Sequence, residues 1–335
     1  MNQIVRFGTA MLLCCTVVLA GCSRKKDEQA LKARQPVFVM VPKGVHPYYE
    51  PCWKGFQDAA KQYGVTVDYR AAKQFEVPQQ VEIIENLIAK HVDGLAISAL
   101  DDQGLVSVIQ QATDAGITVI TFDAPAPSSK ALCYIGTMND AAGYAGGIEM
   151  AKLLDGKGDV AVLQGGLAAP NLNDRYKGFE RALKEKAPGI TIVAREDTQG
   201  KNEVVMNKAE AILLRNPNLR AFFSVSAEGI PGVQSVLRTQ KKEGRILLGG
   251  FDDLPETLTA IRDGVAQFCI AQKTYKMGWL SIEKLLEARS GRQLEKQIDT
   301  GFLIISRANV DTYMQDMTRE FQQPAQTVPG NPPAK

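Results

Sequence analysis

Short apolar runs alternate with amphipathic stretches over most of the chain, and this alternation restricts the fold more than any other feature. The continuous apolar run 36–41 is followed by a helical stretch at 50–63, which Gly64 ends. From Pro78 onward, apolar residues recur every three or four positions, as on one face of a helix. Further strands are expected at 65–69, 94–98 and 117–122, and a further helix at 102–115. Continuous apolar strands between amphipathic helices are typical of a parallel sheet that is covered on both faces.

The second half of the chain repeats this order of elements. We expect strands at 158–164, 190–195, 220–225, 245–250, 265–271 and 299–306. The helices are expected at 139–154, 173–186, 202–215, 229–240, 255–263 and 274–290. The two halves meet near 136–139, after a short strand at 133–135. The sequence therefore predicts an α/β fold of two doubly wound parallel-sheet lobes.

The N-terminal segment has the features of an export signal. Arg6 supplies a positive charge, and the apolar stretch at 10–20 is shorter than the about 20 residues that a spanning helix needs. The signal ends in LAGC at 19–22, which resembles a bacterial lipobox, in which the cysteine is acylated and becomes the new N-terminus. An ordinary signal peptide with a chance cysteine is the alternative. We expect cleavage after residue 21 (signal 1–21) and a lipid on Cys22.

The two ends of the mature chain differ in composition from the part between them. Residues 22–35 are rich in charge and contain one leucine, which predicts a solvated tether between the lipid and the fold. Residues 319–335 contain four prolines and no apolar periodicity, which predicts a disordered tail. The mature protein is then a membrane-anchored lipoprotein that faces the periplasm, or the cell surface in a host with one membrane.

Charge and side-chain chemistry argue against several classes of function. Lys plus Arg total 39 against 37 Asp plus Glu, a net charge of +2, which gives no sign of nucleic-acid binding. No CxxC spacing occurs, and no nucleophile, acid–base pair, GxGxxG or P-loop motif stands out. We therefore expect no metal site, no cofactor, no disulfide framework and no enzyme activity. The residues left without such a role are Cys52, Cys133, Cys269, His46 and His91.

Seven short motifs occur in a fixed order along the chain. They are HPYY at 46–49, ITFD at 120–123, Asn139, LQG at 163–165, RYKGF at 175–179, GFD at 250–252 and AQ at 271–272. Together they resemble the type I periplasmic binding proteins, and within them the ribose-type sugar-binding branch that serves bacterial ABC importers. The resemblance covers about residues 36–305.

The resemblance implies two lobes joined by a hinge. The N-terminal lobe would consist of 36–137 plus 273–293, and the C-terminal lobe of 138–272 plus 294–318. It further implies a monomer that closes over a small carbohydrate and presents it to an ABC permease in the inner membrane.

The resemblance also implies a set of ligand-binding residues, most of which lie just past predicted strand ends. They are Tyr48, Tyr49, Asp123, Asn139, Arg175, Asp252 and Gln272. Open α/β sheets bind ligands at that edge. Asp and Gln can bind sugar hydroxyls, Arg offers a planar fork of donors, and aromatic rings stack on C–H faces.

Several of these residues have structural alternatives. The two tyrosines could form an aromatic cluster with Trp53 that caps the core, and Asp123, which precedes Ala-Pro-Ala-Pro, could shape a turn. Asp252 is adjacent to another aspartate, Asp253, and like charges that close favour separate partners.

Two further candidates have alternatives within their own segments. Arg175 could pair with Asp174 or Glu180 on a solvated helix face, where such pairs contribute about 0–1 kcal/mol. Gln272 could instead hold the backbone of the hinge.

The chain departs from the ribose-binding pattern at three places. Ala124 stands where the family has Arg, Ser226 and Ala227 replace Asn-Asp, and Thr198 and Gln199 replace an aromatic residue. One charged donor, one amide and one ring are therefore missing at these positions. We expect a cleft with fewer polar groups, suited to a deoxy sugar, a polyol or a furanosyl signal rather than ribose.

The leading hypothesis is an extracytoplasmic solute-binding lipoprotein that delivers a sugar, deoxy sugar or polyol to an ABC permease. The alternative is a sensory binding protein that presents a sugar or furanosyl signal to a membrane receptor kinase. The same fold supports both.

Overall fold

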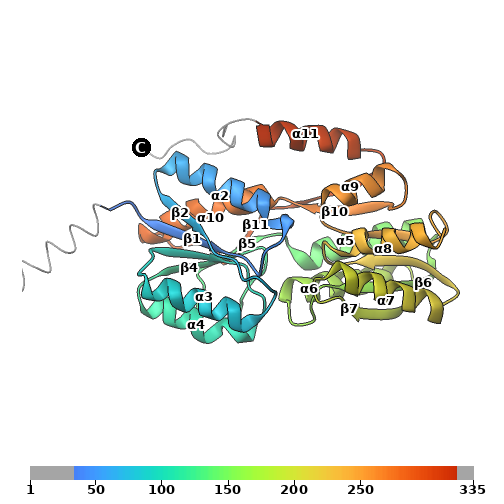
Figure 1. The fold of residues 1–335 in the computed structure, drawn as a ribbon, viewed down its shortest axis with the longest axis horizontal. Helices are drawn as coiled ribbons and strands as arrows, with labels where there is room; N and C mark the ends of the chain where they lie inside the picture. The colour runs from blue at the N-terminus through green and yellow to red at the C-terminus, as the bar shows by residue number, and fades with distance from the viewer. Residues whose placement is uncertain (1–33, 323–335) are drawn as a thin grey trace, which may run out of the picture.

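The structure, a computed structural model, describes residues 34–322, which form two α/β lobes side by side (Figure 1). The expected signal peptide at 1–21 lies outside the described residues, as does the expected tether up to residue 33. The α/β prediction with two parallel-strand sheets is confirmed.

The first lobe contains a six-stranded sheet in the order β11-β5-β4-β3-β1-β2, with every pair parallel. Its strands are β1 (Val37–Val41), β2 (Thr66–Tyr69), β3 (Gly94–Ile97), β4 (Thr118–Phe122), β5 (Tyr134–Gly136) and β11 (Gln297–Asp299). Its helices are η1 (Pro47–Tyr49), α2 (Glu50–Tyr63), α3 (Val77–Ala89), α4 (Asp102–Asp114) and α10 (Thr274–Arg289). Gly64 ends α2 in a left-handed conformation, as the sequence predicts.

The second lobe contains a six-stranded sheet in the order β12-β10-β9-β8-β6-β7, parallel except for β12 against β10. Its strands are β6 (Lys157–Gln164), β7 (Gly189–Asp197), β8 (Leu219–Ser224), β9 (Leu247–Phe251), β10 (Phe268–Gln272) and β12 (Phe302–Ser306). Its helices are α5 (Asn139–Leu153), α6 (Pro170–Lys186), α7 (Asn202–Arg215), α8 (Gly229–Thr239), α9 (Pro255–Arg262) and α11 (Val310–Gln322).

Helices cover both faces of each sheet, so each lobe has two apolar clusters. In the first lobe, α2 and α10 pack on one face, and α3 and α4 pack on the other. In the second lobe, α5 and α6 cover one face, and α7, α8 and α9 cover the other. Within residues 34–322, no helix combines the length and the apolar character that crossing a membrane requires.

Helices α5 and α6 pack with their backbones in contact. A Cβ atom on Gly143 would lie 2.0 Å from the carbonyl oxygen of Arg175, and one on Gly178 would lie 2.0 Å from that of Asp140. Only glycine permits so close an approach. The approach brings Asn139, the first residue of α5, beside Arg175 on α6.

The chain crosses between the lobes three times, after β5, after β10 and between β11 and β12. Two of these crossings are joined, because Thr300 N donates to the carbonyl oxygen of Gly136 at 3.0 Å. Three short crossings at one edge of the sheets agree with the hinge that the resemblance implied.

Two C-terminal elements differ from the sequence-based expectation. Strand β11 pairs with β5 in the first sheet, although residues 294–318 were expected in the second lobe. Its sequence QID is short and mostly exposed, so it gives no apolar signal. Helix α11 was not predicted. It extends four residues into the expected tail at 319–335, and the remainder, 323–335, lies outside the described residues.

Candidate functional site

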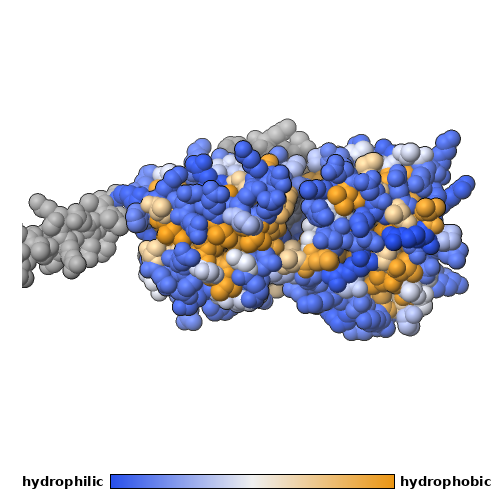
Figure 2. Space-filling view, turned by 60° about the horizontal axis from the view of Figure 1, so that its bottom comes forward, coloured by the Kyte–Doolittle hydropathy of each residue, from blue (hydrophilic) through white to orange (hydrophobic). Residues whose placement is uncertain are grey.

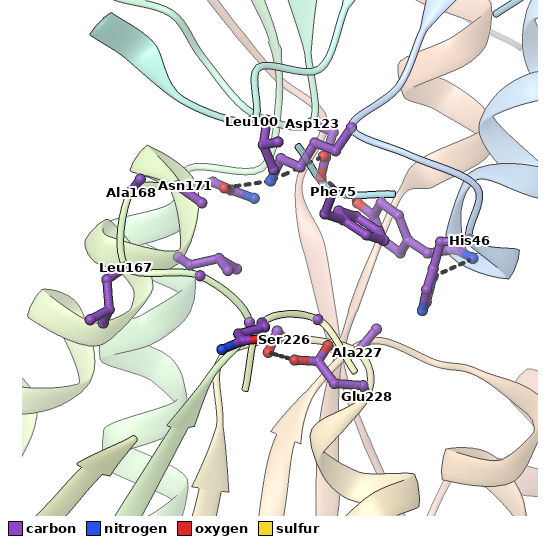
Figure 3. Close-up of a pocket in the computed structure, with 18 of the residues that line it drawn as sticks. His46, Phe75, Leu100, Asp123, Leu167, Ala168, Asn171, Ser226, Ala227 and Glu228 are labelled. Atoms are coloured by element: carbon purple, nitrogen blue, oxygen red, sulfur yellow. Dashed lines mark hydrogen bonds and ion pairs between the residues drawn. The ribbon is translucent and has the colours of Figure 1, made fainter. Parts of the chain in front are cut away.

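A cavity of about 440 Å³ lies between the lobes and is lined by side chains of both (Figure 3). It lies at the carboxyl ends of the parallel strands, where loops and helix starts converge. Six of the seven candidate residues line it: Tyr48, Tyr49, Asp123, Arg175, Asp252 and Gln272. The structure therefore brings together residues that are separated by more than 200 positions in the sequence.

In the first lobe, the polar side chains of the cavity wall are arranged around Asp123. Its Oδ1 accepts from Tyr48 Oη at 2.8 Å, and its Oδ2 accepts from Tyr49 Oη at 3.1 Å and from Ser98 Oγ at 2.6 Å. The Nζ of Lys43 lies 3.8 Å from the same Oδ2. Only 2% of Asp123 is exposed, so this buried carboxylate is held by three hydroxyl donors and a cation.

Asp252 is the corresponding residue of the second lobe, just after β9. Its Oδ1 accepts from Gln272 Nε2 at 2.8 Å, and its Oδ2 lies 3.8 Å from Arg175 Nη1. Burial raises the pKa of Asp252 from an ordinary 3.8 to about 7, although Arg175 and the hydrogen bond from Gln272 act in the opposite direction. Asp253 points to a different partner, Tyr313, whose Oη donates to it. The two adjacent carboxylates thus have separate environments, as expected.

Arg175 is almost fully buried, with 1% of its surface exposed. Its Nε donates to Asn139 Oδ1 at 2.8 Å, and its Nη1 donates to the carbonyl oxygen of Val225 at 2.9 Å. The guanidinium carbon lies 4.2 Å from the centre of the Phe251 ring, a cation–π contact. The alternative pairing of Arg175 with Asp174 or Glu180 is wrong, since neither carboxylate is among its partners.

Asn139 lies behind Arg175 rather than on the cavity wall. Its Oδ1 accepts from Arg175, and its Nδ2 donates to Tyr134 Oη at 3.0 Å. The structure thus places Asn139 where it orients the guanidinium.

Two buried polar atoms of cavity-lining residues have no hydrogen-bond partner within the described part of the chain. They are Arg175 Nη2, a donor, and Gln272 Oε1, an acceptor. An unpaired buried polar atom costs about 1–3 kcal/mol, so such atoms are rare in folded proteins. Both belong to the polar end of the cavity beside Asp252, which we call the floor: Lys43, Tyr48, Tyr49, Asp123, Arg175, Asp252 and Gln272.

The sequence did not single out Lys43 and Asn171, which both line the cavity. Lys43, in the first lobe, donates from Nζ to Asn171 Oδ1 in the second lobe at 2.9 Å, and both residues are buried (Figure 3). Burial lowers the pKa of Lys43, and Asp123 opposes this effect. A lysine two residues after the buried strand β1 was the available signal for this role.

Phe75 was also missed, although it is the one aromatic residue in the otherwise polar connection between β2 and α3. It lines the cavity, where its ring lies near that of His46, with 6.3 Å between the ring centres. Together, Lys43, Asn171 and Phe75 supply a charged donor, an amide and a ring from positions other than those of the ribose binders. The expectation of a cleft with fewer polar groups than in ribose binders stays a prediction.

The alternatives for the aromatic residues are also resolved. Tyr48 and Tyr49 belong to an apolar cluster and also line the cavity. Trp53 packs on Phe56 and Tyr69 and is not among the lining residues. His46 has a structural contact, because its Nδ1 accepts from Tyr48 N, and it also lines the cavity.

Metal chemistry gains no support from the described residues. Between residues 34 and 322, no group of three or more His, Cys, Asp or Glu side chains could hold a metal ion. The cysteines described, Cys52, Cys133 and Cys269, are free and buried.

Comparisons with known proteins agree with this geometry. Residues 37–293 match the family model of the periplasmic binding protein domain. The chain is 25% identical to the D-allose-binding periplasmic protein of Escherichia coli over 257 residues, which is 74% of this chain and 82% of that protein. It is 35% identical to an ABC transporter solute-binding protein from Burkholderia graminis, solved in complex with D-arabinose. That structure gives a TM-score of 0.81 and covers 84% of this chain and 98% of the other. The XylFII–LytSN complex contains a chain that is 26% identical, with a TM-score of 0.77 over 82% of this chain and 99% of that one.

Proposed function

The chain belongs to the periplasmic binding protein domain family, and on this premise we propose that it captures a small carbohydrate by lobe closure and delivers it to an ABC permease. The ligand is a sugar, a deoxy sugar or a polyol. The observation that carries the proposal is the pair of unpartnered atoms on the floor, Arg175 Nη2 and Gln272 Oε1. A hydroxyl group can accept from the first and donate to the second. The D-arabinose bound to the solved relative supports this ligand class.

Each side chain of the floor has a distinct role in this proposal. The carboxylate of Asp123 accepts hydrogen bonds from sugar hydroxyls, and an ionised acceptor makes the stronger bonds. Asp252, whose pKa burial raises to about 7, accepts from a hydroxyl as a carboxylate and donates to one when it is protonated. Arg175 donates to a ring or hydroxyl oxygen, and Asn139 keeps its guanidinium in place. The rings of Tyr48 and Tyr49 present apolar surface to C–H groups of the sugar.

Closure of the lobes couples binding to a change of shape. The floor takes Asp123 from the first lobe and Arg175 and Asp252 from the second, so ligand contacts are complete only when the lobes meet. A ligand favours the closed state by this difference in contacts. The Lys43–Asn171 hydrogen bond joins the lobes and stabilises this arrangement independently of the ligand.

The proposed setting is outside the cytoplasm. The family is periplasmic, and the lipobox-like segment ending at Cys22 supports a lipoprotein anchored by that residue. Several buried acyl methylenes, at about 0.8 kcal/mol each, would hold such a protein at the membrane surface near its permease.

A sensory role is the second candidate. It is favoured by one observation, the XylFII–LytSN complex, in which a similar chain is assembled with another protein. In this alternative, the closed form presents the sugar signal to a membrane receptor kinase instead of a permease.

A thermal-shift screen tests the ligand class. Pentoses, hexoses, deoxy sugars, polyols, nucleosides and amino acids are added to the purified protein. A ligand at about 100 times its Kd adds about 2.7 kcal/mol of stability, which raises Tm by several degrees. We expect the shift with one group of carbohydrates and its loss in Asp123→Ala. Asp174→Ala, which changes an exposed carboxylate beside Arg175, is the matched control.

The same screen can contradict the proposal. A shift with a nucleoside or an amino acid, and none with any carbohydrate, would leave the fold intact and discard the ligand class. The partner is tested separately with the ligand-loaded protein. Stimulated ATP hydrolysis by a reconstituted permease supports transport, whereas binding to a receptor ectodomain alone supports sensing.

A further inference from the structure

The opening of the cavity differs in chemistry from its floor. Apolar side chains from both lobes line it, and we call this group the mouth: Phe75, Val77 and Leu100 from the first lobe, and Leu167, Ala168 and Leu172 from the second. Figure 2 shows hydrophobic surface beside the hollow between the lobes, and Figure 3 shows Leu100 on the side of the first lobe and Leu167 on a loop of the second lobe. Leu167 is 52% exposed.

The acidic residues at the mouth are occupied by local contacts. Asp101 Oδ1 accepts from Gly104 N at 2.7 Å and caps α4, and Asp197 Oδ1 accepts from Gln199 N at 2.8 Å. Glu228, which is buried and also lines the cavity, accepts at Oε1 from Thr198 Oγ1 and Ser226 Oγ. By contrast, both unpartnered buried polar atoms that line the cavity belong to the floor. The floor therefore offers unpartnered hydrogen-bonding atoms to a ligand, whereas the six residues of the mouth offer apolar contact beside polar lining residues such as Ser226 and Glu228.

Phe75 brings a ring into the mouth from the first lobe. A Cβ atom on Gly200, in the second lobe, would lie 3.8 Å from Cδ2 of Phe75. The ring therefore faces the other lobe across the cleft.

The size of the cavity allows a ligand to occupy both parts. Its volume of 440 Å³ lies within the range of roughly 300–1,000 Å³ that is typical of sites for drug-sized ligands. A single sugar ring bound by the floor would leave the mouth to water, with apolar side chains exposed to it.

From these observations we propose that the preferred ligand is a glycoside, a sugar whose ring binds the floor and whose apolar substituent occupies the mouth. This inference rests on the proposed carbohydrate-binding function and names the ligand class for the same site. The substituent gains affinity because its apolar area leaves water against Phe75, Leu100 and Leu167.

Calorimetric titration with matched ligands tests the inference. The probes are D-ribose, D-arabinose, D-allose and D-galactose, each as the free sugar, the methyl glycoside and the phenyl glycoside. For the sugar that binds, we expect the phenyl glycoside to bind roughly tenfold to a hundredfold tighter than the free sugar, with a more negative ΔCp.

Substitutions in the mouth test whether its side chains cause the higher affinity for the phenyl glycoside. Leu167→Ala and Leu100→Ala should reduce the affinity for the phenyl glycoside about tenfold, while the affinity for the free sugar stays within about twofold. Leu167 is exposed, so its substitution does not threaten the fold. Leu214→Ala, a change at an 84% exposed leucine on α7, is the matched control and should change neither affinity.

The outcomes separate this inference from the function on which it rests. If free sugars bind and phenyl glycosides do not, the mouth is a seal that closes over a monosaccharide, and the inference is wrong while the proposed function stands. If the mouth variants weaken free sugar and glycoside equally, the inference is also wrong. If no sugar and no glycoside binds, the proposed function itself fails.

Discussion

Each lobe places an aspartate at an equivalent point, directly after a buried strand, but the two carboxylates have different hydrogen-bond partners. Asp123 and Asp252 are both about 97–98% buried, and both have positive φ angles, 58° and 72°. Three hydroxyl groups donate to Asp123, whereas one amide donates to Asp252. Each carboxylate has a cation at 3.8 Å, Lys43 for Asp123 and Arg175 for Asp252. Burial raises the pKa of Asp252 to about 7.

The comparison shows how a repeated backbone can carry two functions. Non-glycine residues rarely adopt left-handed conformations, and Asp tolerates them better than most. The strained backbone turns each carboxylate toward the cavity, in keeping with strain at functional sites. The hydrogen-bond partners account for the difference between the two aspartates. In the first lobe, protein donors already bind Asp123, whereas in the second lobe Asp252 keeps hydrogen-bonding capacity for a ligand.

Removing Arg175 should have the largest effect, because Asp252 has fewer hydrogen-bond donors than Asp123 and loses its cation in this variant. At pH 8, where Asp252 carries its charge in the wild type, Arg175→Ala leaves the carboxylate buried without its counter-charge, and breaking a buried pair in this way costs about 3–5 kcal/mol. We expect a lower free energy of unfolding in urea and loss of the ligand-induced thermal shift. Arg181→Ala, at an exposed arginine on the same helix, is the control and should cost about 0–1 kcal/mol.

A second substitution sharpens that result. Arg175→Ala combined with Asp252→Asn removes the uncompensated charge, so part of the lost stability should return. Additive losses in the double variant would mean that the two residues do not interact, and the comparison of the lobes would lose its electrostatic basis.

Asp123→Asn should have the next largest effect. Asparagine keeps the size of the side chain and tolerates the positive φ, so the fold should persist. The charge that offsets the buried ammonium of Lys43 is lost, and charged hydrogen bonds to ligand become neutral ones. These bonds contribute about 1.5–3 kcal/mol, so the Kd of the sugar found in the screen should rise roughly tenfold to a hundredfold. Calorimetric titration measures it, and an unchanged Kd would exclude Asp123 from the site.

The sequence singled out six of the seven floor residues but neither Lys43 of the floor nor Phe75 of the mouth, and the positions of these residues in the chain explain why. Asp123, Asp252 and Gln272 follow continuous apolar strands, so their positions at the strand ends could be predicted from periodicity alone. Lys43 and Phe75 lie in irregular connections, where no period indicates which way a side chain points. Their place in the cavity depends on how the lobes approach each other, which the sequence does not encode locally.

The same reasoning applies to the fold. The long buried strands and amphipathic helices were predicted within a few residues of their bounds. Strand β11 and helix α11 were not, because β11 is three residues long and polar, and α11 follows the last strand with a narrow apolar face. The apolar side of α11 packs on the second lobe through Val310, Tyr313, Met314 and Met317.

The raised pKa of Asp252 predicts a moderate effect of pH. Between about pH 4 and pH 7 the folded protein keeps the proton on Asp252 while the unfolded chain has lost it, so the folded state binds more protons. Stability from this residue therefore falls as pH rises through that window. Asp252→Asn should reduce the fall in Tm between pH 5 and pH 8. Asp253 and His46 titrate in both proteins, so the difference between wild type and variant isolates Asp252.

An identical pH profile in wild type and variant would contradict this account of Asp252. It would mean that Arg175 fully offsets the effect of burial on the pKa of Asp252. The two aspartates would then differ less in protonation than their hydrogen-bond partners suggest.

The smallest expected effect compares the two tyrosines on Asp123. Tyr48 Oη is the one described donor to Oδ1, whereas Tyr49 Oη shares Oδ2 with Ser98 Oγ. Tyr48→Phe should therefore lower the free energy of unfolding by about 1–1.5 kcal/mol, and Tyr49→Phe by less, because Ser98 continues to donate. Urea unfolding of both variants without ligand measures the difference. If Tyr49→Phe is the more damaging change, the donors act as one network around Asp123, and removal of any member loosens all of them.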